Sequence, residues 1–254
     1  MTANSDASLF SPLSPKHKLD ILAVGIHPDD VDMTCSGTLL KHMAAGKKCG
    51  ILDLCAGELG TRGSGELRLQ EAAAAAKILG ISIRDNLKMA DGFFRNDKDH
   101  QIAIIKKIRE YQPEIVLCNA ISDRHPDHGR AAKLVADACF YSGLIKVETA
   151  YDGFKQQHWR PKAVYHYIQD HNLKPDFVVD VTPYVDKKME AVKAFKSQFY
   201  DPESKEPESP ITVKNFFDML KGKMSALGRD IGVDFAEGYN VDRTIGVDNL
   251  FDLK

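Results

Sequence analysis

Residues 21–30 decide the fold, and they read ILAVGIHPDD. The first six are apolar or glycine, and a short continuous run of this kind predicts a buried strand of a parallel sheet. The run then ends in a histidine, a proline and two adjacent carboxylates. Because open α/β sheets bind their ligands beyond the carboxyl ends of the strands, we expect His27, Asp29 and Asp30 to lie at a functional site.

A second polar cluster, HPDH at residues 125–128, follows another apolar run, IVLC at residues 115–118. Parallel strands bring their carboxyl ends to one edge of a sheet, so we expect the two clusters to meet there. Imidazole and carboxylate groups are common metal ligands in proteins. The two strand ends therefore predict one composite metal site.

The rest of the chain alternates between apolar runs and segments of helical spacing. Strands are predicted at residues 21–26, 48–54, 81–89, 115–118, 163–168 and 177–181. Helices are predicted at residues 37–45, 66–79, 98–111, 128–141, 182–199 and 211–227. This alternation predicts an α/β, Rossmann-like fold: a mostly parallel sheet with helices on both faces.

The sequence predicts a simple domain organisation. Residues 1–18 form a flexible N-terminal arm, and residues 19–254 form a single α/β domain. Within that domain, the Pro-rich, acidic residues 200–210 are expected to be a loop, and residues 211–254 a C-terminal capping segment. Whether this segment covers the site does not follow from its sequence.

Composition excludes several classes of partner. The chain has 34 Lys and Arg against 36 Asp and Glu, so it lacks the basic excess that nucleic-acid or anionic-membrane binding requires. The polar N-terminus lacks the apolar core of a signal peptide, and we therefore predict a cytoplasmic protein. Five cysteines without a CxxC pair predict reduced thiols rather than disulfides.

The residue types in the two clusters suit a mononuclear hydrolytic metal centre, which needs about three protein ligands and an open position for water. His27, Asp30 and His128 would supply two imidazoles and one carboxylate. Asp29 cannot easily share the same point, and we predict that it acts as the general base. The same donor set describes the Fe²⁺ facial triad, so the ligands alone leave Zn²⁺ and Fe²⁺ open.

The second cluster predicts further catalytic groups. If it is protonated, His125 could donate a proton to a leaving amine or stabilise an oxyanion. We expect Asp127 to hold the imidazole of His125 and raise its pKa, and to cap the helix that follows. Asp32 is a candidate for holding His27 in place, and a solvated loop carboxylate is the alternative.

The glycine-rich loop GELGTRGS at residues 57–64 lacks the GK[ST] and GxGxxG patterns of phosphate-binding loops. It places Arg62 beside the site, where a guanidinium could bind a carboxylate or hydroxyl of a substrate. A solvated arginine is the alternative. Glu66, Arg68 and Glu71 on the next helix are expected to form structural pairs only.

Together these motifs resemble the PIG-L/LmbE-like metal-dependent deacetylases, whose strand-end signature is AHPDDxE. The chain has IHPDDVD at residues 26–32, HPDH unchanged at residues 125–128, and a loop at residues 57–64 that is similar to the family's. The resemblance implies Zn²⁺ bound by His27, Asp30 and His128. It also implies Asp29 as general base and His125 as the acid or charge-stabilising group.

Within this family the sequence is most similar to the bacillithiol-pathway branch, which removes acetate from N-acetylglucosaminyl malate. The DGFF segment at residues 91–94 and FAEGY at residues 235–239 carry this likeness. The predicted substrate-binding residues are Glu58, Arg62 and Tyr239, and relatives imply a homo-oligomer such as a hexamer. The alternatives are deacetylation of another N-acetylglucosamine conjugate (inositol-linked or oligosaccharide), a different metal hydrolase such as a phosphoesterase, and a non-catalytic nucleotide- or ligand-binding module.

Overall fold

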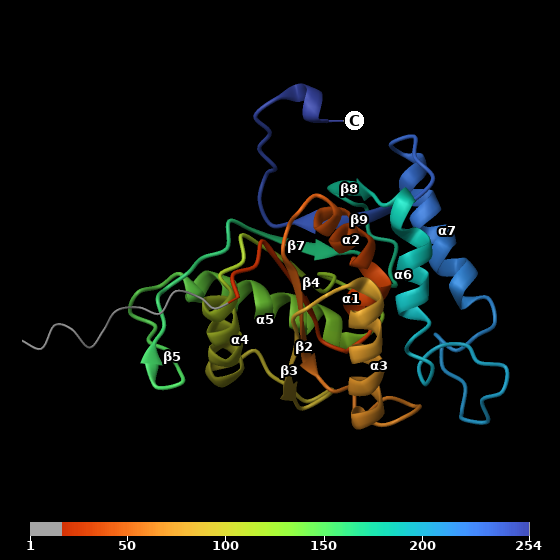
Figure 1. The fold of residues 1–254 in the computed structure, drawn as a ribbon, viewed down its shortest axis with the longest axis horizontal. Coiled ribbons are helices and arrows are strands. Elements are labelled where there is room, and N and C mark those ends of the chain that lie inside the picture. Colours follow the sequence, from red (N-terminus) through yellow and green to blue (C-terminus); the bar gives the residue numbers. More distant parts are fainter. Residues whose placement is uncertain (1–16, 254) are drawn as a thin grey trace, which may run out of the picture.

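The computed structural model describes residues 17–253 (Figure 1), so the predicted arm over residues 1–18 lies almost wholly outside the described residues. The main sheet of this part of the chain has seven strands in the order β3-β2-β1-β4-β7-β9-β8. β9 pairs antiparallel with β7 and β8, and the other neighbours pair in parallel. The strands are β1 (Ile21–Gly25), β2 (Cys49–Cys55), β3 (Arg84–Met89), β4 (Ile115–Cys118), β7 (Ala163–Tyr167), β8 (Phe177–Asp180) and β9 (Ala236–Val241).

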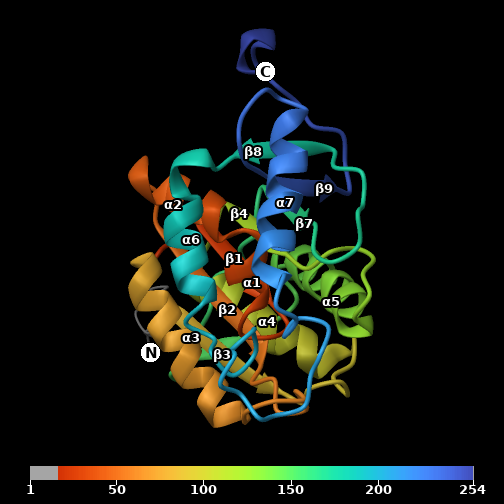
Figure 2. The same ribbon diagram turned by 90° about the vertical axis from the view of Figure 1, so that its right-hand side faces the viewer.

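Helices cover both faces of the sheet, which confirms the predicted architecture (Figures 1 and 2). One face is covered by α4 (Lys98–Tyr111) and α5 (Pro126–Ser142). The other is covered by α1 (Asp30–Thr34), α2 (Ser36–Ala44), α3 (Gly65–Leu79), α6 (Val185–Val192) and α7 (Phe216–Arg229). A hairpin of β5 (Ala150–Tyr151) and β6 (Phe154–Lys155) lies apart from the sheet. No helix of residues 17–253 has the length and apolar character needed to cross a membrane.

The first strand is apolar throughout because both of its faces are buried. Leu22 and Val24 pack in the core beneath α4 and α5, whereas Ile21 and Ala23 pack in the core on the opposite face. All four side chains are at most 3% exposed. A half-buried strand would have alternated apolar with polar residues instead.

The site is positioned by the strand order. β1 continues through β2 to β3 on one side, and the chain then crosses to β4 on the other side of β1. The order therefore reverses between β1 and β4, and ligand sites of open α/β sheets lie at such a switch point. The two predicted clusters follow these two strands.

The C-terminal segment differs from the prediction, because residues 236–241 form β9 inside the sheet and are not part of a cap. Their sequence, AEGYNV, does not read as a strand, since it places a glutamate where a core residue is expected. Glu237 is buried there because its carboxylate accepts hydrogen bonds from the Gly37 and Thr38 backbone N–H groups and pairs with Lys188. Only the tertiary partners make this strand possible.

Two predicted helices are shorter than expected. The segment 182–199 divides into a 3₁₀ turn at Thr182–Tyr184 and the helix α6, and α7 begins at Phe216 rather than at residue 211. Beyond α6, the Ser197 backbone N–H and hydroxyl both donate to the carboxylate of Glu71, on α3. Tertiary contacts thus hold this stretch in a non-helical path.

Candidate functional site

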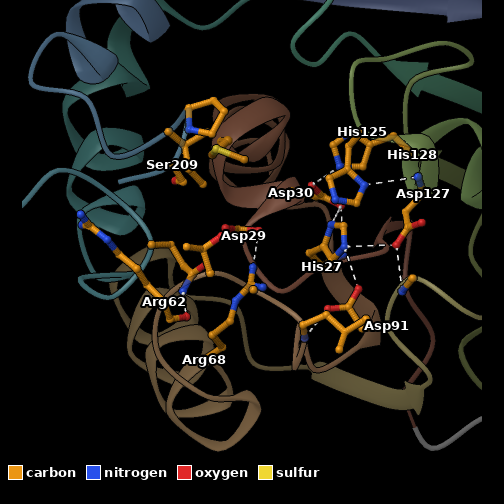
Figure 3. Close-up of a pocket in the computed structure, with 18 of the residues that line it drawn as sticks. His27, Asp29, Asp30, Arg62, Arg68, Asp91, His125, Asp127, His128 and Ser209 are labelled. Atoms are coloured by element: carbon orange, nitrogen blue, oxygen red, sulfur yellow. Dashed lines mark hydrogen bonds and ion pairs between the residues drawn. The ribbon is translucent and has the colours of Figure 1, made fainter. Parts of the chain in front are cut away.

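The loops that follow β1 and β4 line one cavity of about 370 Å³ (Figure 3). All the predicted metal-binding and catalytic residues lie in its wall: His27, Asp29, Asp30, His125, Asp127 and His128. Arg62 also lines it, whereas Glu58 and Tyr239 do not. The sheet therefore brings together two clusters that are about a hundred residues apart in the sequence.

His27, Asp30 and His128 converge as predicted. One potential ligand atom from each of them lies within 4.8 Å of the other two. The Oδ1 atom of Asp30 is 3.2 Å from Nε2 of His128, and its Oδ2 atom is 3.7 Å from Nδ1 of His27. Cys55 is also close to His27, but its thiol donates to the Ile26 carbonyl at 2.9 Å, and burial raises its pKa to about 12.

Each histidine of this triad has a carboxylate on its outer ring nitrogen. Nδ1 of His128 is 2.5 Å from Asp123, and Nε2 of His27 is 3.2 Å from Asp91 and 3.6 Å from Asp127. Such a carboxylate makes the outer nitrogen an N–H donor and directs the inner lone pair toward a metal. The donor set therefore fits a divalent cation. Sequence reasoning did not assign Asp91 or Asp123, although both lie in loops that follow strands.

Without a bound cation, neighbouring carboxylates change the pKa of His128. Burial disfavours the imidazolium form of His128, but the charge of Asp30 and the hydrogen bond to Asp123 outweigh it. They raise the pKa of His128 to about 9. A proton and a metal therefore compete for the same ring nitrogen.

Asp30 is held rigidly by hydrogen bonds from three directions. Its Oδ2 atom accepts from the His27 backbone N–H at 3.0 Å and from Asn119 at 2.9 Å, and its Oδ1 atom accepts from Gln169 at 3.0 Å. Both in-plane lone pairs of Oδ2 are therefore engaged by fixed donors, whereas Oδ1 has one such donor and otherwise faces Nε2 of His128, which is the nitrogen on which a proton and a metal compete. We conclude that Oδ1 is the oxygen available to a metal. Neither Asn119 nor Gln169 was found from the sequence, which carries no local signal for them.

Asp29 lies in the same cavity and forms a buried ion pair with Arg68 (Figure 3). Nη2 of Arg68 is 2.9 Å from Oδ1 of Asp29, and Nη1 donates to the Gly57 carbonyl at 3.2 Å. Gly57 has φ +69°, and a Cβ there would collide with the guanidinium, so this close approach requires glycine. Arg68 was expected to be only structural, but it holds the predicted base.

The prediction that the Asp127 carboxylate holds His125 is wrong. The Asp127 backbone N–H donates to Nδ1 of His125 at 3.3 Å, so His125 rather than Asp127 is the N-cap of α5. The Asp127 carboxylate instead accepts from the Gly92 backbone N–H at 3.1 Å and pairs with Arg130. Burial, followed by charge on His27 and His128, lowers the pKa of His125. Its ring is therefore neutral at pH 7, with the proton on Nε2.

The three predicted substrate-binding residues differ in their surroundings. Arg62 lines the cavity, but its Nε and Nη2 atoms donate to the carbonyls of Pro207 (2.6 Å) and Glu206 (3.1 Å), so it fastens the 200–210 loop. Glu58 accepts from the Asp91 backbone N–H at 2.9 Å and lies outside the cavity wall.

Tyr239 is misplaced in the prediction. It lies in β9, where its ring stacks on Phe177 and its hydroxyl donates to Thr38 at 2.6 Å. The side chain is 1% exposed and belongs to the core beneath α2, because β9 is an inner strand of the sheet. It cannot contact a substrate in this position.

Asp32 also has a different partner from the expected one. It pairs with Arg84 at 2.9 Å rather than with His27, and Arg84 pairs in turn with Asp53 at 2.8 Å. Burial raises the pKa of Asp32 to about 7. Because Arg84 also donates to the Pro28 carbonyl, this cluster anchors the backbone of the first loop of the site.

Comparison with known proteins agrees with this geometry. The profile of the family described as GlcNAc-PI de-N-acetylase (PIG-L) matches residues 22–139, which include both clusters. Diacetylchitobiose deacetylase of Thermococcus kodakarensis is 28% identical over 194 residues, which cover 70% of each chain. 4-Oxalmesaconate hydratase of Pseudomonas putida is 28% identical over 196 residues, which cover 70% of this chain and 73% of the hydratase.

Among solved structures, the conserved protein TT1542 from Thermus thermophilus is 31% identical to this chain, with a TM-score of 0.79. The match covers 91% of this chain and 98% of TT1542. The strand-end motifs lie within the stretch that matches the family profile, and the likeness to TT1542 extends over 91% of the chain. The protein therefore belongs to the PIG-L family of deacetylases.

Proposed function

We propose that this protein is a metal-dependent N-deacetylase that hydrolyses the acetamide of an N-acetylglucosamine conjugate. One observation carries the proposal: a histidine–aspartate triad that fits a metal opens into the same cavity as a buried, arginine-held carboxylate. A pure binding module has no need of such a base. The family's description and the chitobiose deacetylase both support N-acetylglucosamine as the sugar.

His27, Asp30 through Oδ1, and His128 would hold the cation. The family resemblance favours Zn²⁺, and the donor set also accepts Fe²⁺. When bound, the metal would polarise the acetamide carbonyl and lower the pKa of water toward neutrality. The outer carboxylates Asp91 and Asp123 keep the two imidazoles oriented.

The chain's own residues move the protons. Asp29, oriented by Arg68, accepts a proton from the attacking water, and the water oxygen bonds to the acetamide carbon. His125 donates a hydrogen bond from Nε2–H to the oxyanion that develops. The C–N bond then breaks, the amine takes the proton from Asp29, and acetate leaves.

The test is release of acetate and free amine from a panel of N-acetylglucosamine conjugates, with chelator and with added Zn²⁺. The Asp29→Asn variant should keep about one metal per chain and lose roughly 10²–10⁴-fold in kcat, the usual contribution of a general base. Asp248→Asn, at an exposed position of the C-terminal tail, is the matched control and should keep full activity. Full activity in Asp29→Asn would refute the role of Asp29.

The finer prediction, N-acetylglucosaminyl malate in bacillithiol biosynthesis, belongs in the same panel beside diacetylchitobiose. A preference for the malate conjugate would support that branch. We also predict that the protein is cytoplasmic and that it forms a homo-oligomer such as a hexamer. Light scattering would measure the oligomeric state.

Hydration of an unsaturated acid is a second candidate, because the 4-oxalmesaconate hydratase is as similar to this chain as the chitobiose deacetylase is. The same triad and base could direct water to a C=C bond. Loss of ultraviolet absorbance of a conjugated unsaturated dicarboxylate, without acetate release from any sugar, would favour this alternative.

A further inference from the structure

A second cavity, of about 600 Å³, adjoins the site. Four residues line both cavities: Met33, Arg124, His128 and Ile211. The ligand His128 thus stands in a wall that the two cavities share. The two cavities therefore lie side by side at the triad.

Half of the residues that line the second cavity have apolar side chains, and they are concentrated on one side of it. Helix α7 contributes most of them, and Ile168 and Leu173 come from the segment between β7 and β8. The α7 residues are Phe216, Met219, Leu220, Ala226 and Leu227. Met219 is 52% exposed, so an apolar side chain stands at the rim, where apolar surface is still open to be covered.

The cations of this wall already have partners. Lys223 donates from Nζ to the carbonyls of Asp170 at 2.8 Å and His171 at 3.3 Å, and also to that of Gln169. Arg124 pairs through Nε with the carboxylate of Asp170. The charges of Lys223 and Arg124 are thus partly offset by groups of the protein, and three carboxylates, Asp123, Asp170 and Asp230, line the same cavity, so the wall carries no net positive charge from these side chains that would select an anion.

We propose that the second cavity binds an apolar aglycone of the substrate, the group joined to the N-acetylglucosamine ring that occupies the first cavity. The inference rests on the proposed deacetylase function and specifies its substrate class. Burying an apolar group against α7 removes apolar surface from water, which strengthens binding.

The test compares two substrates that differ only in the aglycone: benzyl and methyl glycosides of N-acetylglucosamine, each as both anomers. Amine release is measured with the zinc-loaded full chain. For the better anomer we expect kcat/KM at least tenfold higher for the benzyl than for the methyl glycoside. Equal values, or a higher kcat/KM for the malate conjugate, would overturn the inference.

Two variants change the cavity by different means. Met219→Glu places a charge at its rim, and Ala226→Trp fills it from an exposed position of α7. Each should lower the benzyl-to-methyl ratio of kcat/KM at least tenfold. Ile145→Glu is the control, since Ile145 is 72% exposed and lies outside both cavity walls. It should keep the ratio of the unaltered protein.

The outcomes separate this inference from the proposed function. Absence of amine release from all conjugates, with about one metal per chain, would refute the deacetylase function itself. Release from both glycosides at equal kcat/KM would refute only the apolar subsite. If Met219→Glu dissociates an oligomer and leaves the ratio unchanged, the cavity is covered by a second copy of the chain and the inference is wrong.

Discussion

Arg68 is the residue that most directly holds Asp29, the proposed general base. Its guanidinium reaches from α3 to Asp29 and to the Gly57 carbonyl, and all three residues are buried. Removing one partner of a buried ion pair leaves the other charge uncompensated, which is costly. Arg68 therefore positions Asp29 and does not itself take part in proton transfer.

We predict that Arg68→Met lowers kcat by roughly 10–100-fold, while the metal content stays near one per chain. Arg68→Lys should recover part of the loss, because an ammonium can pair with Asp29 but cannot also reproduce the planar contact with Gly57. Kinetics and metal analysis on the same preparations check this. If Arg68→Lys has no higher kcat than Arg68→Met, the ion pair with Asp29 does not contribute to kcat.

Asp123 affects the metal through His128. Its carboxylate holds the outer nitrogen of that ring at 2.5 Å. Loss of such an outer partner commonly costs 10–100-fold in metal affinity. We predict that Asp123→Asn weakens Zn²⁺ binding by about this factor in a competitive chelator titration. Asp137→Asn, on the same helix as His128 but paired with Lys133, should bind Zn²⁺ like the unaltered protein.

At the scale of elements, Asp85 of β3 ties this edge strand to α4. Lys107 is 2.8 Å from its carboxylate, and Tyr111 also donates to it. Burial raises the pKa of Asp85, but these two hydrogen bonds outweigh it, so the pKa is lowered overall. A carboxyl group with a depressed folded-state pKa stabilises the fold above its unfolded value, about 3.9, and loses this contribution as the pH falls through the folded value.

We therefore predict that Asp85→Asn destabilises the protein at pH 7, and that the difference from the unaltered protein shrinks as the pH drops below about 4. Urea unfolding at several pH values measures it. Asp248→Asn should show no such difference at any pH. If the difference in the free energy of unfolding between Asp85→Asn and the unaltered protein grew toward low pH, the stabilising role of the Asp85 carboxylate would be contradicted.

Across the whole molecule, a metal held by the proposed triad would link segments that are far apart in the sequence. His27 and Asp30 follow β1, whereas His128 lies on α5 beyond β4. A ligand that binds only the folded state stabilises it by mass action, by about 2.7 kcal/mol at a hundredfold excess over Kd. For a chain of this size that corresponds to a rise in Tm of roughly 5–10 °C.

We predict a rise in Tm of this order when Zn²⁺ is added to chelator-treated protein, measured by scanning calorimetry. His128→Ala should abolish the rise, because it removes one of the ligands. A rise of the same size in His128→Ala would place the metal elsewhere.

The sequence by itself predicted the mostly parallel sheet, except for β9, and it placed the proposed triad, Asp29 and His125 at one edge of that sheet. It could do so because these features are local: an apolar run defines a buried strand, and the residues just beyond it must lie at its carboxyl end. Parallel strands then bring the ends of β1 and β4 to one edge. Chain direction and burial pattern are enough for this step.

Only the tertiary structure decided which groups surround those side chains. Arg68 reaches Asp29 from α3, Gln169 reaches Asp30 from beyond β7, and Asp123 pairs with His128, whereas the Asp127 carboxylate does not hold His125. Tyr239 lies in the core rather than at the predicted site, because β9 inserts antiparallel into the sheet. These partners depend on which elements become neighbours, and since that contact is non-local, no periodicity or motif in the chain records it.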